Sequence, residues 1–277
     1  MARSERPSVD RRNFLRNAAM TGAATLLAPA GTSPALLAGP GQVETSPPRD
    51  VKEMTTDRPG ADFMVDVIKS LGFEFVCGNP GSSYRGLYES IVNYGRNQNP
   101  KWNLCTHEES AVAMCHGYSK IEGKPLLVCI HGTVGLQHSA MALYNAWCDR
   151  APVFVIVGNV LDSTIRRPGL DTIHSAQDPI AMVRDFVKWD DQPTTLQGFA
   201  ESAVRAYRIA MTPPMLPVAL VADFHVQEDP VPEGAKLHIP KLNLPQPPQG
   251  DSGSVAETAR LLVKAGNPVI IAERAAR

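Results

Sequence analysis

The chain has 277 residues, a formal net charge of −1 and 43% hydrophobic residues. This length predicts one or two globular domains, and the balanced charge gives no indication of a nucleic-acid or anionic membrane surface. The five cysteines form no Cys-x-x-Cys pair, and their odd number argues against a complete disulfide framework. We expect most of them to be small buried hydrophobic residues.

The N-terminus carries a candidate export signal. Asp10–Arg16 has a twin-arginine pattern followed by a bulky apolar pair, and Ala28–Ala30 offers small residues for cleavage. The apolar stretch from Ala18 to Ala30 is too short and too rich in Ala and Gly to predict a stable membrane span. We expect export through the twin-arginine route to the periplasm or beyond. The alternative is a basic tail on a cytoplasmic protein, and in either case residues 1–50 are expected to be a signal and disordered segment.

Helix and strand patterns alternate from residue 57 onward. Gly72 should end the first helix, and Ser82 or Ser83 can cap the helix that follows the turn Gly78–Gly81. Short apolar strands separated by helices predict βαβ units, hence an α/β fold with a doubly wound, mostly parallel sheet in a domain over 55–226. The expected helices are 61–68, 82–94, 108–121, 134–148, 179–186 and 198–211, and the expected strands are 73–77, 102–106, 125–131, 152–158 and 217–222.

The C-terminal part has a different composition. Residues 227–250 are rich in proline and predict an extended linker. A helix over 254–265 and a strand over 268–272 should follow. One helix and one strand bury too little surface for a core of their own. We therefore expect residues 251–277 to be the incomplete start of a second, central domain.

Polar residues follow three of the predicted strands. The Gly78–Gly81 turn, Glu108 and His131 all lie at or just after strand ends. Ligands of parallel α/β sheets bind at the carboxyl ends of strands, so we expect these residues to form one site. Taken alone, Glu108 has an ordinary explanation, because acidic residues favour the first turn of a helix.

Four motifs in sequence carry a family resemblance: Gly78–Ser82, Cys105–Ala111 with His116–Tyr118, His131–Gly135, and Asn145–Trp147. Together they resemble the N-terminal, pyrimidine-binding domain of thiamine diphosphate (ThDP) enzymes. Benzoylformate decarboxylase and the acetolactate synthase group are the relatives that they suggest. The resemblance extends over roughly residues 57–275. It is specific for the family and much less specific for the substrate.

The resemblance implies a cofactor and its ligands. In the family a glutamate bonds to the pyrimidine ring of ThDP and stabilises the imino form that acts as base. Glu108 matches that glutamate, with Glu109 as the alternative if the register slips by one residue. Asn79, Pro80 and Gly81 match positions that contact the cofactor.

His131 and Ser82 match residues on the substrate side. A histidine at the place of His131 lies near the reacting carbonyl in benzoylformate decarboxylase-like enzymes, where proton transfer near neutral pH suits its chemistry. A serine at the place of Ser82 contacts the substrate carboxylate in the same group. The alternatives are a hydrogen-bonded structural histidine and a helix-capping serine. His107, His116 and His138 are expected to be local or surface histidines, and no cluster of His, Cys or Asp has metal-ligand spacing.

The family's diphosphate and Mg2+ are held by a third domain with a Gly-Asp-Gly…Asn stretch, which this sequence lacks. We therefore expect a piece of a 2-keto acid decarboxylase or carboligase that acts through a ThDP carbanion, inactive alone and a homodimer or homotetramer when complete. Alternatives are a natural pyrimidine-binding subunit that pairs with a separate diphosphate-binding subunit, and a non-catalytic module. A plain nucleotide-binding domain is not supported, because Gly-x-Gly-x-x-Gly and Walker motifs are missing from the sequence.

Overall fold

The structure is a computed structural model that describes residues 58–160, 174–246 and 248–272. The twin-arginine pattern and the candidate cleavage site lie outside these residues. The strands are β1 (Phe75–Gly78), β2 (Lys101–Leu104), β3 (Leu127–Ile130), β4 (Phe154–Asn159), β5 (Trp189–Asp191) and β6 (Val218–Asp223). The helices are α2 (Gly60–Ser70), α3 (Arg85–Val92), α4 (Glu108–Glu122), α5 (Gly132–Cys148), α6 (Leu196–Met211), α7 (Phe224–Glu228) and α8 (Ser252–Lys264), with 3-10 turns η2 (Ser82–Tyr84), η3 (Pro179–Met182) and η4 (Arg184–Phe186).

The six strands form one sheet in the order β2-β1-β3-β4-β6-β5, and every neighbouring pair is parallel. The predicted α/β class and parallel sheet are confirmed. β5 was not predicted as a strand, because only three residues form it and two of them are aspartates. β1 pairs with β2 on one side and β3 on the other, so the winding direction reverses between β1 and β3. Such a reversal opens a crevice at the carboxyl edge.

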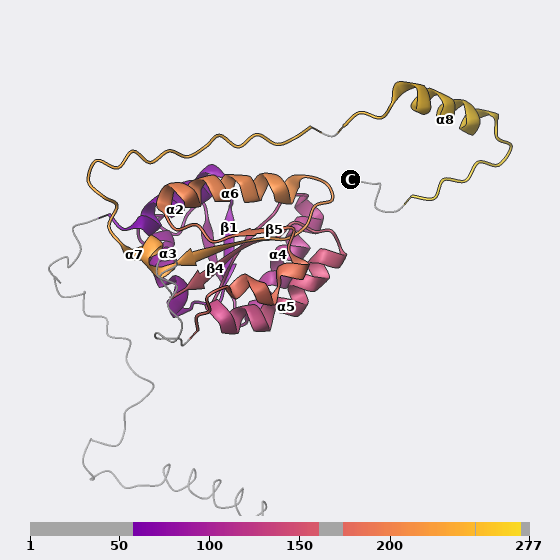
Figure 1. The fold of residues 1–277 in the computed structure, drawn as a ribbon. Coiled ribbons are helices and arrows are strands. Elements are labelled where there is room, and N and C mark those ends of the chain that lie inside the picture. Colours follow the sequence, from indigo (N-terminus) through magenta and orange to yellow (C-terminus); the bar gives the residue numbers. More distant parts are fainter. Residues whose placement is uncertain (1–57, 161–173, 247, 273–277) are drawn as a thin grey trace, which may run out of the picture. The chain divides into compact units, whose positions relative to one another are not determined.

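Helices cover both faces of the sheet (Figure 1). One hydrophobic core joins α2, α3 and α6 to the sheet and contains the buried residues Met64, Leu87, Phe154 and Phe199. The other joins α4 and α5 to the opposite face and contains Val112, Leu136 and Leu143. The central strands β3 and β4 are buried along their whole length, as expected for parallel strands with both faces covered.

Three local predictions were wrong. The expected helix over 179–186 is two short 3-10 turns, η3 and η4, of the kind that proteins use as connectors. Neither Ser82 nor Ser83 caps a helix, because α3 begins after Tyr84 without a side-chain cap. Residues 268–272 form no strand, since a strand requires a partner and none is present among the described residues.

The proline-rich segment after α7 partly follows the domain surface. Leu237, Ile239 and Leu242 pack against the core of α2, α3 and α6. Gln197 of α6 donates to the carbonyl of His238 and accepts from its N–H, at 3.1 and 2.9 Å. The division into a domain, a linker and a partial second domain stays a prediction.

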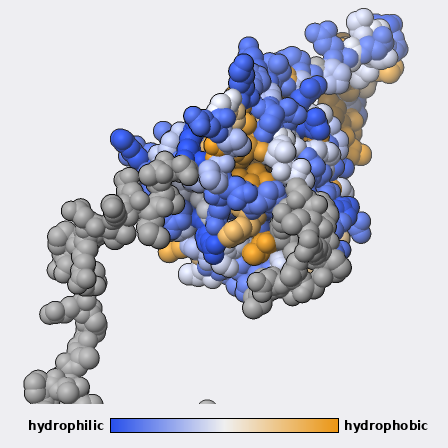
Figure 2. Space-filling model, turned by 60° about the vertical axis from the view of Figure 1, so that its left-hand side comes forward, coloured by the Kyte–Doolittle hydropathy of each residue, from blue (hydrophilic) through white to orange (hydrophobic). Residues whose placement is uncertain are grey.

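The surface combines polar and apolar areas. Figure 2 shows one face, mostly hydrophilic, with a hydrophobic area near its centre. Large exposed apolar side chains include Leu104 at the end of β2, Met114 on α4, Met141 and Tyr144 on α5, and Leu261 and Val263 on α8. Within the part of the chain that the structure describes, no helix has the length and apolarity needed to cross a membrane.

Candidate functional site

The turn after β1 is held in place from inside the domain. The buried hydroxyl of Tyr84 donates a short hydrogen bond to the carbonyl oxygen of Asn79. Gly81 lies directly over His131, because a Cβ at residue 81 would stand 2.6 Å from the imidazole Cγ. Glycine is therefore required for this close approach. Asn79 and Gly81 are half-buried at the edge of the site, and Pro80 is exposed.

Glu108 is the first residue of α4, and its side chain is buried, with only 6% exposure. His107 caps the helix, since its Nδ1 accepts a hydrogen bond from the N–H of Glu109 at 3.2 Å. Within the described residues, the Glu108 carboxylate receives one hydrogen bond, from Asn79 Nδ2 at 3.4 Å. A buried carboxylate normally has several partners. Glu108 thus keeps acceptor capacity, while Glu109 is exposed.

Gly135 on α5 leaves space beside this carboxylate. A Cβ at residue 135 would lie 3.1 Å from Glu108 Cγ, 3.3 Å from Glu108 Oε1 and 2.8 Å from Cγ2 of Ile130. Because α5 carries no side chain at this point, the carboxylate of Glu108 fits between α4 and α5. Close packing against Glu108 and Ile130 therefore explains the glycine at position 135 of the motif, and this packing could not be predicted from the sequence.

His131 directly follows β3, is the N-cap residue of α5 and is half-buried. Its Nδ1 lies 2.6 Å from the Oγ of Ser83. The ring of His174 lies 4.6 Å away, centroid to centroid. Burial, followed by repulsion from His174, lowers the pKa of His131 below its ordinary value, while the carboxylate of Glu108 acts in the opposite direction. His131 is therefore held in its neutral form near pH 7.

The structure brings together Asn79, Gly81, Glu108 and His131, as the sequence predicted. Ser82 lies next to Gly81 but is exposed, and Ser83 rather than Ser82 contacts the histidine. Sequence reasoning missed Ser83, whose only signal was its place beside the motif. It also missed His174, whose carbonyl accepts from the N–H of Thr133 at 3.2 Å, because no local pattern marks a residue so distant along the chain.

The three histidines predicted from the sequence to be local or surface residues, His107, His116 and His138, make local contacts. His116 Nε2, on α4, lies 3.0 Å from the carboxylate of Asp149, the C-cap residue of α5. The rings of His107 and His138 are in edge contact at 4.7 Å. Across the described ranges, no group of three or more His, Cys, Asp or Glu side chains could hold a metal ion.

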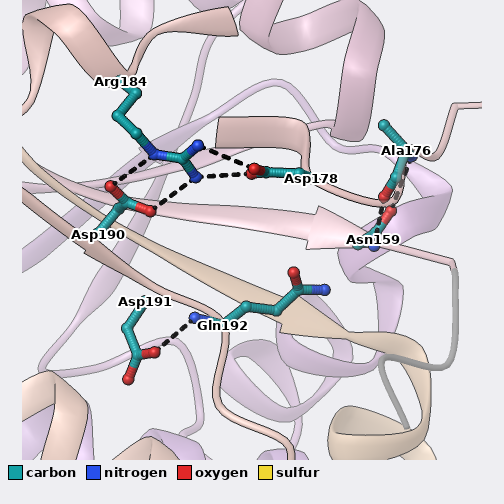
Figure 3. A network of polar contacts seen from close by, with 7 residues as sticks. All are labelled: Asn159, Ala176, Asp178, Arg184, Asp190, Asp191 and Gln192. Atoms are coloured by element: carbon teal, nitrogen blue, oxygen red, sulfur yellow. Dashed lines mark hydrogen bonds and ion pairs between the residues drawn. The ribbon is translucent and has the colours of Figure 1, made fainter. Parts of the chain in front are cut away.

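A second polar group lies further along the same edge of the sheet, at the ends of β4 and β6. Asn159 binds the backbone of Ala176 with both halves of its amide, accepting from the N–H at 3.3 Å and donating to the carbonyl at 3.2 Å (Figure 3). The buried carboxylate of Asp223 accepts from Asn159 Nδ2 at 2.9 Å and from Gln192 Nε2 at 3.0 Å. These residues are paired with one another and fix the segment that follows residue 173.

An ion-pair network stands beside this group. Arg184 donates to Asp178 at 2.7 and 2.8 Å and to Asp190 at 3.1 and 3.2 Å (Figure 3). All of these side chains are partly exposed. The network therefore contributes less to the free energy of unfolding than the buried hydrogen bonds of Asp223. Its effect is to tie η4 to β5.

Comparisons with known proteins agree with the geometry. Residues 58–181 match the family described as "Thiamine pyrophosphate enzyme, N-terminal TPP binding domain". The chain is 26% identical over 227 residues to the acetolactate synthase large subunit of Lactococcus lactis, covering 80% of this chain and 38% of that protein. It is 26% identical over 166 residues to acetolactate synthase of Bacillus subtilis, covering 60% of this chain and 28% of that protein.

Solved structures show the same fold. The crystal structure of benzoylformate decarboxylase from Polynucleobacter necessarius superposes with a TM-score of 0.64 at 25% identity, covering 76% of this chain and 38% of that one. This chain thus spans well under half the length of the relatives that it matches.

Proposed function

Because residues 58–181 belong to the N-terminal TPP-binding domains of thiamine pyrophosphate (ThDP) enzymes, we propose that this chain forms the pyrimidine-binding part of a ThDP-dependent 2-keto acid decarboxylase or carboligase. The buried, under-partnered carboxylate of Glu108 is the observation that carries the proposal. The names of the relatives, acetolactate synthase and benzoylformate decarboxylase, support a 2-keto acid as the substrate class.

The residues present fit the aminopyrimidine end of the cofactor. A carboxyl group in a dry pocket can hydrogen-bond a ring nitrogen strongly, because water does not compete there. Glu108 offers such a group with free acceptor capacity, and Asn79 and Gly81 border it. Bound ThDP supplies the carbon nucleophile that adds to the substrate carbonyl. Glu108 would hold the proton shared with the pyrimidine nitrogen, and Asn79 would orient the carboxylate.

His131 and Ser82 are proposed to serve the substrate. The neutral imidazole of His131 can donate a hydrogen bond or a proton to an oxygen of the substrate. The exposed hydroxyl of Ser82 lies next to Gly81, which itself contacts His131, and can donate to the substrate carboxylate. His131 and Ser82 would then act at the keto group and the carboxylate respectively.

We further propose that residues outside this chain hold the diphosphate and its Mg2+, as parts of a homodimer, a homotetramer or a separate subunit. This division is supported by the match to the acetolactate synthase large subunit of Lactococcus lactis, of which the chain covers 38%. The twin-arginine pattern at Asp10–Arg16 supports export. Replacing Arg11 and Arg12 by lysine should keep a fused reporter in the cytoplasm, and continued export would contradict this assignment.

The test is a calorimetric titration of ThDP into the chain and two matched variants. Glu108→Gln removes the buried carboxylate, and Glu109→Gln makes the same change at the exposed neighbour. We expect Glu108→Gln to weaken binding about tenfold or more, because a charge-assisted hydrogen bond is lost, with Glu109→Gln unchanged. Equal affinities for all three proteins, or loss in Glu109→Gln alone, would overturn the assignment of Glu108.

A further inference from the structure

Ser83 lies beside His131 and is buried, with 1% exposure. It is the second residue of η2, and its Oγ stands 2.6 Å from Nδ1 of His131. The same oxygen accepts a hydrogen bond from the backbone N–H of Gly132 at 3.0 Å. The hydroxyl is therefore held between the histidine and the first residue of α5.

Counting hydrogens gives the direction of the bond between Ser83 and His131. A serine hydroxyl has one proton to donate and two lone pairs to accept with. Gly132 occupies one lone pair, and His131 Nδ1 is the acceptor within reach among the described residues. If Nδ1 carried the proton instead, the buried hydroxyl proton would have no acceptor, which is unfavourable.

We infer that Ser83 is a positioning residue that holds His131 in the neutral tautomer with its proton on Nε2. Ser83 is not itself placed to attack a substrate. A Cβ at Gly158 would lie 2.6 Å from Ser83 Oγ, so the backbone of β4 covers the hydroxyl on its other side. The Ser83–His131 pair therefore orients a donor and does not form a hydrolytic dyad.

The consequence for chemistry rests on the proposed function. With Nδ1 bound to Ser83, the remaining Nε2–H is a fixed donor for a substrate oxygen. Protonating Nδ1 would deprive the Ser83 hydroxyl of its acceptor. Burial and His174 also favour the neutral ring, because they lower the pKa of His131 against the opposing effect of Glu108. Tyr84 also faces the ring, in edge contact at 6.5 Å, and its pKa is raised by burial, so it stays neutral.

The test is 15N NMR of histidine side chains in the full chain, without cofactor. Loss of a signal in His131→Asn assigns the resonance. We expect wild-type His131 to favour the Nε2–H tautomer about tenfold, the preference that one buried hydrogen bond gives. Ser83→Ala should bring the two tautomers close to equal population. Ser82→Ala removes a hydroxyl one residue away and should leave the preference unchanged.

Several results would overturn the inference. A wild-type spectrum with the Nδ1–H tautomer dominant does so without any variant, and so does an unchanged preference in a folded Ser83→Ala protein. If Ser83→Ala does not fold, the wild-type spectrum alone decides. Because this measurement needs neither ThDP nor turnover, it can fail while Glu108→Gln still weakens cofactor binding, and the reverse is equally possible.

Discussion

The carboxyl edge of the sheet holds two buried carboxylates in opposite situations. Glu108, which opens α4 after β2, receives one long hydrogen bond at 3.4 Å from the described residues. Asp223, at the end of β6, accepts from Asn159 at 2.9 Å and from Gln192 at 3.0 and 3.1 Å. Both are nearly inaccessible, at 6% and 0% exposure. Burial alone therefore does not distinguish a functional carboxylate from a structural one.

The two carboxylates differ in how many of their hydrogen-bond acceptor positions are occupied by donors of the protein. A buried carboxylate whose acceptors are filled stabilises the fold, because removing it would leave its donors unpaired. A buried carboxylate with unfilled acceptors is unfavourable in the fold and is explained by a ligand that completes it. On this argument we propose that the first half of the edge, at β1–β3, is the binding region, and that the second half, at β4–β6, supports it.

The largest expected effect is a loss of activity when the carboxylate of Glu108, rather than that of Asp223, is removed. Glu108→Gln in the complete enzyme, with the diphosphate-binding residues present, should lower kcat by about 10²- to 10⁴-fold, the range for loss of an acid–base group. Its free energy of unfolding should barely change, because few bonds are lost. Steady-state kinetics on 2-keto acids and urea unfolding test this. Near-wild-type turnover would remove Glu108 from the mechanism.

The matching change at the other carboxylate should affect stability instead. Asp223→Asn weakens charge-assisted bonds to Asn159 and Gln192, and we expect the free energy of unfolding to fall by about 2 kcal/mol. Urea unfolding of Asp223→Asn and Glu108→Gln under the same conditions compares their free energies of unfolding directly. If Asp223→Asn destabilises the protein no more than Glu108→Gln does, the contrast between the two halves is wrong.

A methyl group at Gly135 should disturb the site from the α5 side. Its Cβ would meet Ile130 Cγ2 at 2.8 Å and Glu108 Cγ at 3.1 Å. We expect Gly135→Ala to cost about 1–2 kcal/mol of stability through overpacking and to weaken ThDP binding. Gly117→Ala on α4 is the control, because nothing lies within 4 Å of a Cβ there. Equal effects of both variants on ThDP affinity would contradict the role of Gly135.

The smallest expected effect is a pH dependence of stability at His131. Its folded pKa is lowered from the ordinary value of 6.5, so the unfolded chain binds more protons in the window below that value. The contribution of His131 to stability is therefore complete above about pH 6.5 and is lost as pH falls toward the folded pKa. Thermal unfolding between these limits should be less pH-dependent in His131→Asn than in wild type. Identical slopes would show that His131 is not held neutral.

Much of this arrangement could be predicted from the sequence, although particular elements could not. The helix from Glu108 and the buried strands at β3 and β4 were predicted within a few residues, since apolar periodicity and capping act locally. β5 was missed because its three residues carry no apolar pattern. The helix expected over 179–186 became two 3-10 turns, with Arg184 between Asp178 and Asp190.

By itself the sequence determined the α/β class, the parallel strands and the grouping of Asn79, Glu108 and His131 at one edge, because periodicity and strand ends are properties of short segments. Only the tertiary structure decided that Ser83 rather than Ser82 contacts His131 and that the ring of His174 lies beside the ring of His131. It also decided that the carboxylate of Asp223 has its hydrogen-bond donors while that of Glu108 lacks most of them. Those facts depend on side chains 29 to 64 residues apart in the sequence meeting at distances of a few ångströms. The packing of β1, β3, β4 and β6 sets such distances, and no local pattern encodes them.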